Sequence, residues 1–145
     1  MFWRRKPKQA LILKTYLSAA MPLVSQERLS NPVVKASLQV FILGMADMLR
    51  QAERLGWEDF ATIYESALSE FALLPSMPVN SFIDSIGRAA SKNADVEKVM
   101  RYGAQSIKMY VGERDANAPT DLISAAMFAQ NNVASFSDLS GVKGL

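Results

Sequence analysis

Residues 31–56 read NPVVKASLQVFILGMADMLRQAERLG, and this stretch decides the fold. Asn31 can cap the free amides at the start of a helix, and Pro32 has the backbone torsion that the first helical position needs. Apolar residues then recur at three- and four-residue spacing, and the middle of the stretch is apolar nearly all round. We therefore expect residues 33–55 to form the central helix of a bundle, closed by Gly56 in the left-handed conformation.

The rest of the chain repeats this helical spacing. Five further segments are expected to be helical: residues 8–24, 58–74, 80–91, 94–111 and 119–131. No segment shows the alternation of a half-buried strand, and short connections favour antiparallel neighbours. The predicted fold is all-α, a single-domain irregular helical bundle of five or six helices. It occupies residues 1–131 with a basic arm at residues 1–8, while residues 132–145 lose the apolar periodicity and form a flexible tail.

The apolar stripes also predict the core and the surface of the bundle. We expect Phe41 and Phe71 to be buried, and Trp57 and Leu74 to lie on the same inward stripe as Phe71. Two oppositely charged pairs have the favourable four-residue spacing on outward faces: Asp84 with Arg88, and Glu97 with Arg101.

The chain contains no histidine and no cysteine in 145 residues. These types supply the usual proton shuttle near neutral pH, the thiolate nucleophile and the common nitrogen and sulfur metal ligands. Glycine-rich phosphate-binding motifs are absent too, and the S-x-x-K match at residues 140–143 lies in the expected tail. We predict no catalytic, cofactor-binding or metal-binding residue, and no cofactor. If an all-oxygen cation site existed, Glu113, Asp115 and Asp121 would be its first candidates.

Positive charge is concentrated at the amino terminus. The first 26 residues hold five basic residues and no acid, whereas 11 basic and 14 acidic residues follow, a net charge of −3. Aromatic and cationic side chains stand together at the very start, which is the composition of an anchor for an anionic membrane surface or an acidic protein. The predicted partner-binding or membrane-binding residues are Phe2, Trp3, Arg4, Arg5, Lys6 and Lys8.

Neither of two apolar stretches predicts a membrane segment. Residues 36–49 are 14 in number and include Gln39 and Asp47, whereas a spanning helix needs roughly 20 apolar residues. Residues 10–24 follow a basic start as in a signal peptide, but Lys14 interrupts them. The absence of cysteine fits a reducing compartment, so we expect a cytoplasmic protein, with peripheral membrane contact as an open alternative.

These features favour a non-enzymatic helical interaction module, an adaptor or regulatory subunit that uses helix faces and the basic arm. A protein partner is expected first, an anionic membrane surface second, and homo-oligomerisation stays open. One alternative is a DNA-associated regulatory factor, because residues 82–105 have a helix-turn-helix outline with four cations. Asp95 and Glu97 in its second helix would face phosphates unfavourably. The other alternative is a His- and Cys-independent enzyme or a small-ligand-binding bundle.

The arm generates a first prediction. Deleting residues 2–8 should leave the melting temperature nearly unchanged, because this segment precedes the first apolar stripe. Binding to anionic vesicles or to an acidic protein, measured by titration at low and high salt, should fall sharply on deletion. The electrostatic part should weaken with salt while the part due to Trp3 persists. Equal binding by the truncated chain, or its unfolding, would mean that the arm is structural.

Overall fold

The central helix forms as expected at its start and differs at its end. In a computed structural model, which describes residues 8–140, helix α3 (Pro32–Glu53) begins where the Asn31 side chain accepts hydrogen bonds from the amides of Val33 and Val34. The left-handed residue at its end is Arg54 (φ 53°), and the Leu55 amide donates to the Arg50 carbonyl. The expectation for Gly56 is wrong, because Gly56 is extended and begins the next helix.

Residues 8–140 contain eight α-helices and two short 3-10 helices, and no strand. The all-α class is confirmed, while the expected count of five or six helices is too low. The elements in chain order are α1 (Lys8–Ala20), η1 (Met21–Leu23), α2 (Gln26–Leu29), α3, α4 (Trp57–Glu70), α5 (Val79–Lys92), α6 (Ala94–Gly112), η2 (Ala118–Thr120), α7 (Asp121–Asn131) and α8 (Val133–Ser140). The two unexpected helices are α2 and α8. Helix α2 is a single turn started by the Ser25 hydroxyl, too short to leave a periodic pattern.

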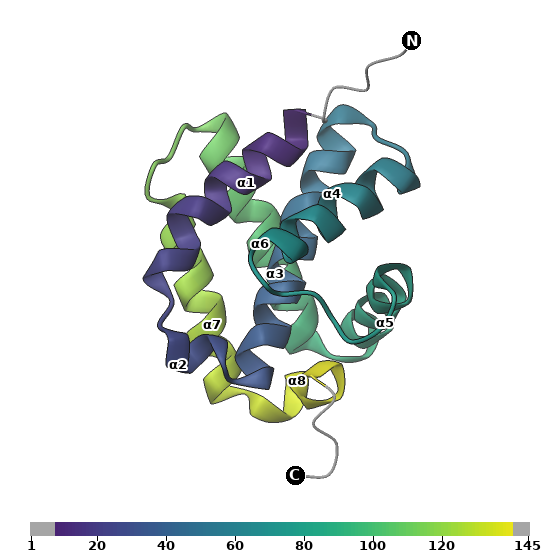
Figure 1. The fold of residues 1–145 in the computed structure, drawn as a ribbon, viewed down its shortest axis with the longest axis vertical. Helices are drawn as coiled ribbons and strands as arrows, with labels where there is room; N and C mark the ends of the chain where they lie inside the picture. Colours follow the sequence, from purple (N-terminus) through teal and green to yellow (C-terminus); the bar gives the residue numbers. More distant parts are fainter. Residues whose placement is uncertain (1–7, 141–145) are drawn as a thin grey trace.

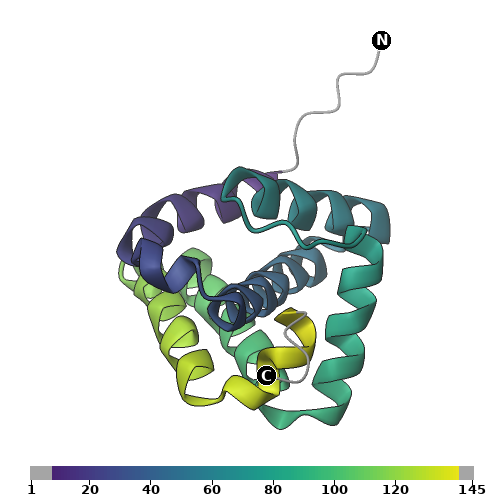
Figure 2. The same ribbon diagram turned by 60° about the horizontal axis from the view of Figure 1, so that its bottom comes forward.

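The other helices surround α3 (Figure 1). Figure 2 shows α3 running through the middle of the molecule, with α1 and α4 along one side, α5 along the next and α7 along a third. Helix α6 packs against α3 over more residues than any other pair of helices, and α7 and α8 also lie against α3. A helix enclosed on all sides must be apolar all round, which explains the composition of its middle.

Two glycines allow α3 and α6 to approach closely. A β-carbon at Gly44 of α3 would overlap the Met100 carbonyl oxygen of α6, and a β-carbon at Gly103 of α6 would overlap the Phe41 carbonyl oxygen of α3. Both obstacles are backbone atoms of a helix, so neither could move aside without displacing that helix. The two backbones therefore meet where each helix has no side chain.

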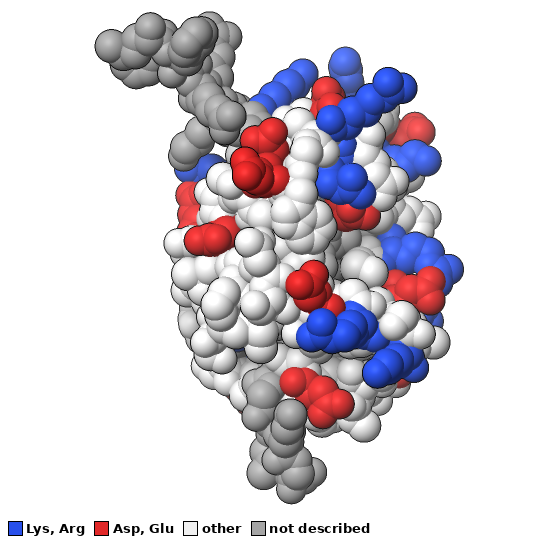
Figure 3. All heavy atoms as spheres, turned by 90° about the vertical axis from the view of Figure 1, so that its right-hand side faces the viewer, with Lys and Arg blue, Asp and Glu red and all other residues white. Residues whose placement is uncertain are grey.

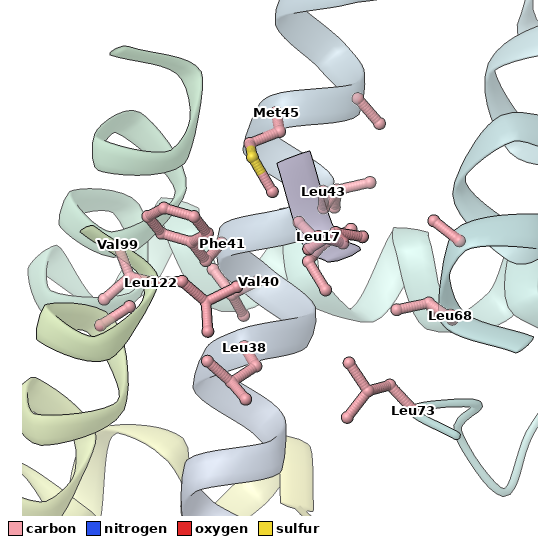
Figure 4. Packing of buried hydrophobic residues seen from close by; sticks show 14 of the residues in the cluster. Leu17, Leu38, Val40, Phe41, Leu43, Met45, Leu68, Leu73, Val99 and Leu122 are labelled. Carbon is pink, nitrogen blue, oxygen red and sulfur yellow. The ribbon is translucent and has the colours of Figure 1, made fainter. Parts of the chain in front are cut away.

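The core fills the spaces on both sides of α3. Figure 4 shows Phe41 of α3, Val99 of α6 and Leu122 of α7 gathered on one side, with Leu68 and Leu73 on the other. The burial expected for Phe41 is confirmed, whereas Phe71 is only partly buried. Trp57 is 52% exposed and Leu74 is 42% exposed, so the expected stripe is inward only between these ends. Both lie at or beyond the ends of α4, where the chain leaves the core.

One of the two expected surface pairs forms. Arg101 and Glu97 are joined at 2.7 Å on α6. Arg88 of α5 does not reach Asp84 and instead donates to the Ser85 hydroxyl at 3.3 Å. Exposed pairs of this kind contribute little to stability, so the difference does not alter the fold.

Helix α8 lies in the segment that the sequence assigned to a flexible tail, and residues 133–140 are helical there. Phe136 is completely buried and meets the Phe128 ring edge-on at a centroid distance of 6.3 Å. The Ser135 hydroxyl donates to the Asp95 carboxylate of α6 at 2.6 Å. The Asn93 side-chain amide also donates to the Ser135 carbonyl at 3.5 Å. Few positions of this short helix are buried, so no period is visible in the sequence.

Buried tyrosines connect the outer helices to the centre. The Tyr16 hydroxyl of α1 lies 2.6 Å from the Ser106 hydroxyl of α6 and donates to the Ala118 carbonyl at 3.0 Å. The Tyr64 hydroxyl of α4 donates to the Gln39 carbonyl of α3 at 2.7 Å. Because buried polar groups are costly unless they are bonded, these contacts fix where α1 and α4 lie against the core.

Helix α3 is also long and apolar enough, by length and composition alone, to cross a membrane. In this structure 78% of its most apolar 18-residue window is buried inside the molecule. The enclosed core helix of a bundle meets the same compositional test, and enclosure is what residues 8–140 show for α3.

The helix crossing generates a second prediction. Gly44→Ala and Gly103→Ala should each lower the free energy of unfolding by more than about 3 kcal/mol, because the added methyl group overlaps backbone atoms of the facing helix. Gly87→Ala is the matched control: a β-carbon there meets nothing within 4 Å, and alanine favours the helix by about 0.5–1 kcal/mol. Urea unfolding of the three variants measures these changes. Losses below about 1 kcal/mol at both crossing sites would contradict the close approach.

The buried tyrosines generate a third prediction. Burial raises the pKa of Tyr64 well above its ordinary value of 10.0, and it raises the pKa of Tyr16 as well. The folded state thus holds these protons more tightly than the unfolded state does. Their contribution to stability is complete below the unfolded pKa and is lost as the pH rises through the folded one. The free energy of unfolding should therefore fall above about pH 10, by up to about 1.4 kcal/mol per pH unit for each tyrosine.

Urea unfolding between neutral pH and strongly alkaline pH tests this prediction. Tyr64→Phe should be less stable at neutral pH, because it lacks the bond to Gln39, but its stability should fall less steeply above pH 10. An alkaline slope identical to that of the unmodified chain would show that Tyr64 does not carry the effect.

Candidate functional site

A half-open groove runs between α6 and α7. Its volume is about 580 Å³, within the range of ligand-binding sites. Helix α6 forms one wall and most of the floor, and α7 forms the other wall. The residues that line it are Ala94, Lys98, Val99, Arg101, Tyr102, Gln105, Ser124, Ala125 and Phe128. We call this feature the α6–α7 groove.

The α6 wall carries a row of exposed polar side chains, which we call the α6 rim: Lys98, Arg101, Gln105 and Lys108. Their three- and four-residue spacing places them on one face of the helix. Arg101 is paired with Glu97. The Lys98 ammonium has no carboxylate partner within residues 8–140 and lies 5.2 Å from the centre of the Phe128 ring, across the groove. The rim is therefore positive, and its charge is only partly compensated.

The floor of the groove is mainly apolar and contains one hydroxyl donor. Tyr102 packs edge-on against Phe41, and its hydroxyl donates to the Asp121 carboxylate at 3.0 Å. Burial raises the pKa of Tyr102, and the hydrogen bond to Asp121 raises it further. The phenol therefore stays protonated at neutral pH and keeps Asp121 occupied.

This arrangement suits binding better than catalysis. None of the nine lining residues is a carboxylate, and a general acid or base near neutral pH would have to come from one of them. The groove offers an apolar surface between aromatic walls, with cations along one edge. A ligand that fits must present apolar groups inward and negative charge along one side.

The residues predicted from the sequence as a binding arm fall almost wholly outside the part that the structure describes. This applies to Phe2, Trp3, Arg4, Arg5 and Lys6, whereas Lys8 is the exposed first residue of α1. The S-x-x-K match likewise lies at and beyond the end of the described residues. The arm therefore stays a prediction from the sequence.

Two of the three carboxylates named for a cation site, Asp115 and Asp121, accept hydrogen bonds from neighbouring groups, whereas no contact of the Glu113 side chain is seen among residues 8–140. Asp115 accepts a hydrogen bond from the Asn117 amide at 2.9 Å, and Asp121 is held by Tyr102. Between residues 8 and 140 there is no group of three or more acidic residues arranged to hold a metal ion.

The outline of a helix-turn-helix at residues 82–105 is present as α5, Asn93 and α6. However, the first turn of α6 is packed on α8 through Asp95 and Ser135, and α6 faces α3 at Gly103. A recognition helix needs that first turn free to enter the major groove. Figure 3 shows the side of the molecule that carries α4 and α5, where acidic side chains lie among the basic ones. Neither feature favours DNA binding by this element.

Sequence reasoning counted Lys98 and Arg101 among the four cations of the helix-turn-helix outline and paired Arg101 with Glu97, but it missed the groove. The spacing of the α6 rim was visible in the sequence as a signal. The opposite wall was not visible in the sequence, because Phe128 and Ser124 come to line the groove only when α7 packs beside α6. No family model, curated protein or solved structure matches the chain.

Proposed function

We propose that this protein is a non-enzymatic interaction module that binds an acidic, amphipathic helix of a protein partner in the α6–α7 groove. The observation that carries the proposal is the Lys98 ammonium, which stands beside an apolar groove with no carboxylate partner in residues 8–140. An acidic partner would supply the missing charge, and its apolar face would cover the groove. Adaptor and regulatory proteins use such surfaces.

The length of the groove suits a short helix. The lining residues on α6 extend from Ala94 to Gln105, which corresponds to roughly 16 Å or three helical turns. A partner helix of this length presents an apolar stripe with residues at three- and four-residue spacing. Phe128 and Tyr102 would contact that stripe, and the α6 rim would lie along its edge.

The two parts of the surface would contribute differently. Most of the affinity would come from burying apolar area, at roughly 25 cal/mol per Å² before the costs of association. Each exposed ion pair adds only about 0–1 kcal/mol. The charges of the α6 rim would therefore set the orientation of the partner and the rate of association more than the affinity.

The predicted basic arm supports the same charge preference. The arm has basic residues and no acidic residue in its sequence, and the α6 rim carries cations that are only partly compensated, so each favours an acidic partner over a basic one. The proposal places the protein in the cytoplasm, where such partners are available. Binding to anionic vesicles through the arm is the competing outcome, and it would not require the groove.

A designed peptide pair tests the proposal. One peptide is a three-turn helix with leucine along one face and glutamate along its flanks, and the second has lysine in place of glutamate. The acidic peptide should bind and the basic one should not. Ser124→Trp, which fills the groove, should weaken binding by more than about tenfold, and Lys98→Glu by at least about threefold. Fluorescence anisotropy of the labelled peptides measures both changes.

Matched variants keep the test specific. Ser66→Trp places the same ring at an exposed position of α4, and Lys92→Glu makes the same charge change on α5, so neither should alter binding. The proposal is wrong if both peptides bind alike, or if Ser124→Trp binds the acidic peptide as well as the unmodified chain does. Binding that is lost only on deletion of residues 2–8 would assign it to the arm instead.

A further inference from the structure

A second cavity lies beneath the connection between α4 and α5. Residues 71–78, which we call the strap, cross in front of α3 and lead into α5 (Figure 1). The cavity beneath them has a volume of about 710 Å³ and is larger than the α6–α7 groove. Its walls come from the strap, from the first turns of α3, from α5 and from the end of α8. We call it the strap cavity.

The strap is fixed to the core rather than loosely draped over it. Leu73 is 2% exposed, and its carbonyl accepts a hydrogen bond from the Gln39 amide nitrogen at 2.6 Å. Gln39 is held in turn by the Tyr64 hydroxyl, which donates to its backbone carbonyl. The adjacent Ala72 has φ 57°, a conformation that an alanine adopts only when its surroundings impose it. The cavity is therefore preformed.

The strap cavity is lined by one positively charged and one negatively charged side chain. Lys35 of α3 and Asp138 of α8 both line it, and neither forms an ion pair within residues 8–140. Gln39 also lines the cavity and is 3% exposed. Its amide nitrogen is used by Leu73, while its side-chain oxygen accepts no hydrogen bond from the described part of the chain. Lys35 and Gln39 are four residues apart on α3 and so lie on one face of that helix.

Most of the remaining lining residues are apolar, and three serines, Ser30, Ser76 and Ser85, lie among them. The apolar ones are Leu29, Pro32, Ala72, Pro75, Met77, Phe82 and Leu139. A ligand with one kind of charge would satisfy only one of the two ionised groups, and an uncharged apolar ligand would remove water from both without replacing it. A ligand with an ammonium group, a carboxylate and an apolar body between them would pair with both ionised groups and cover the apolar part of the lining.

From this juxtaposition we propose that the strap cavity binds a small zwitterion with an apolar body, of the kind formed by a short apolar peptide with free termini. Asp138 takes the ammonium group, Lys35 takes the carboxylate, and Gln39 accepts a hydrogen bond from a backbone amide of the ligand. The strap cavity and the α6–α7 groove share no lining residue, so this proposal does not depend on the proposed function.

Ligand and protein charges can be removed separately, which gives a sharp test. The probes are the tripeptide Leu-Ala-Leu, its N-acetylated form and its C-terminal amide, titrated at neutral pH and followed by NMR. Leu-Ala-Leu should bind saturably to the unmodified chain, and each modification should weaken binding by about fivefold. With Asp138→Asn the effect of N-acetylation should disappear, and with Lys35→Met the effect of amidation should disappear.

Two control variants separate these pairings from a general effect of net charge. Asp84→Asn on α5 and Lys92→Met at the end of α5 make the same changes outside the strap cavity. In both variants, N-acetylation and amidation of the tripeptide should still weaken binding as they do in the unmodified chain. The inference fails if Leu-Ala-Leu shows no saturable binding. It fails equally if N-acetylation and amidation weaken binding by the same factors in Asp138→Asn and Lys35→Met as in the unmodified chain.

Discussion

The close crossing of α3 and α6 sets the positions of the other helices. Gly44 and Gly103 each face a backbone carbonyl of the opposite helix, so the two helices meet without intervening side chains. This contact fixes both the rotation of α6 about its axis and its distance from α3. The remaining helices then pack against a pair whose geometry is already set, and α3 becomes enclosed on all sides (Figure 2).

The rotation of α6 explains the position of the candidate site. Because Gly103 points at α3, the residues on the opposite side of α6 point away from the core, and these are the cations of the α6 rim. Helix α7 lies beside α6 and is tied to α3 by the Ser37 hydroxyl, which donates to the Ala125 carbonyl at 2.8 Å. The α6–α7 groove is thus a consequence of two contacts with α3. A shift of either helix would change its width.

Buried polar groups complete the arrangement by tying neighbouring elements to particular points of the core. Tyr16 joins α1 to α6, and Gln39 joins α3 to both α4 and the strap. Every side-chain nitrogen or oxygen atom of the described residues that is fully shielded from solvent has a hydrogen-bond partner. Apolar packing alone would allow these helices to slide, whereas a buried hydroxyl or amide has few acceptable partners. The walls of the strap cavity are held in place by these bonds.

The all-α class, the central place of residues 33–55 and the helix start at Asn31 could be predicted from the sequence, because spacing and capping act within a few residues of the chain. The role of Gly44, the folding of α8 around Phe136, and the opposite walls of the α6–α7 groove and the strap cavity became visible only in the folded chain. These features depend on which distant segments pack together, and a local sequence pattern does not show which segment will pack against it. A glycine at a helix crossing and a glycine on a helix surface, such as Gly87, look alike until the facing backbone is in place.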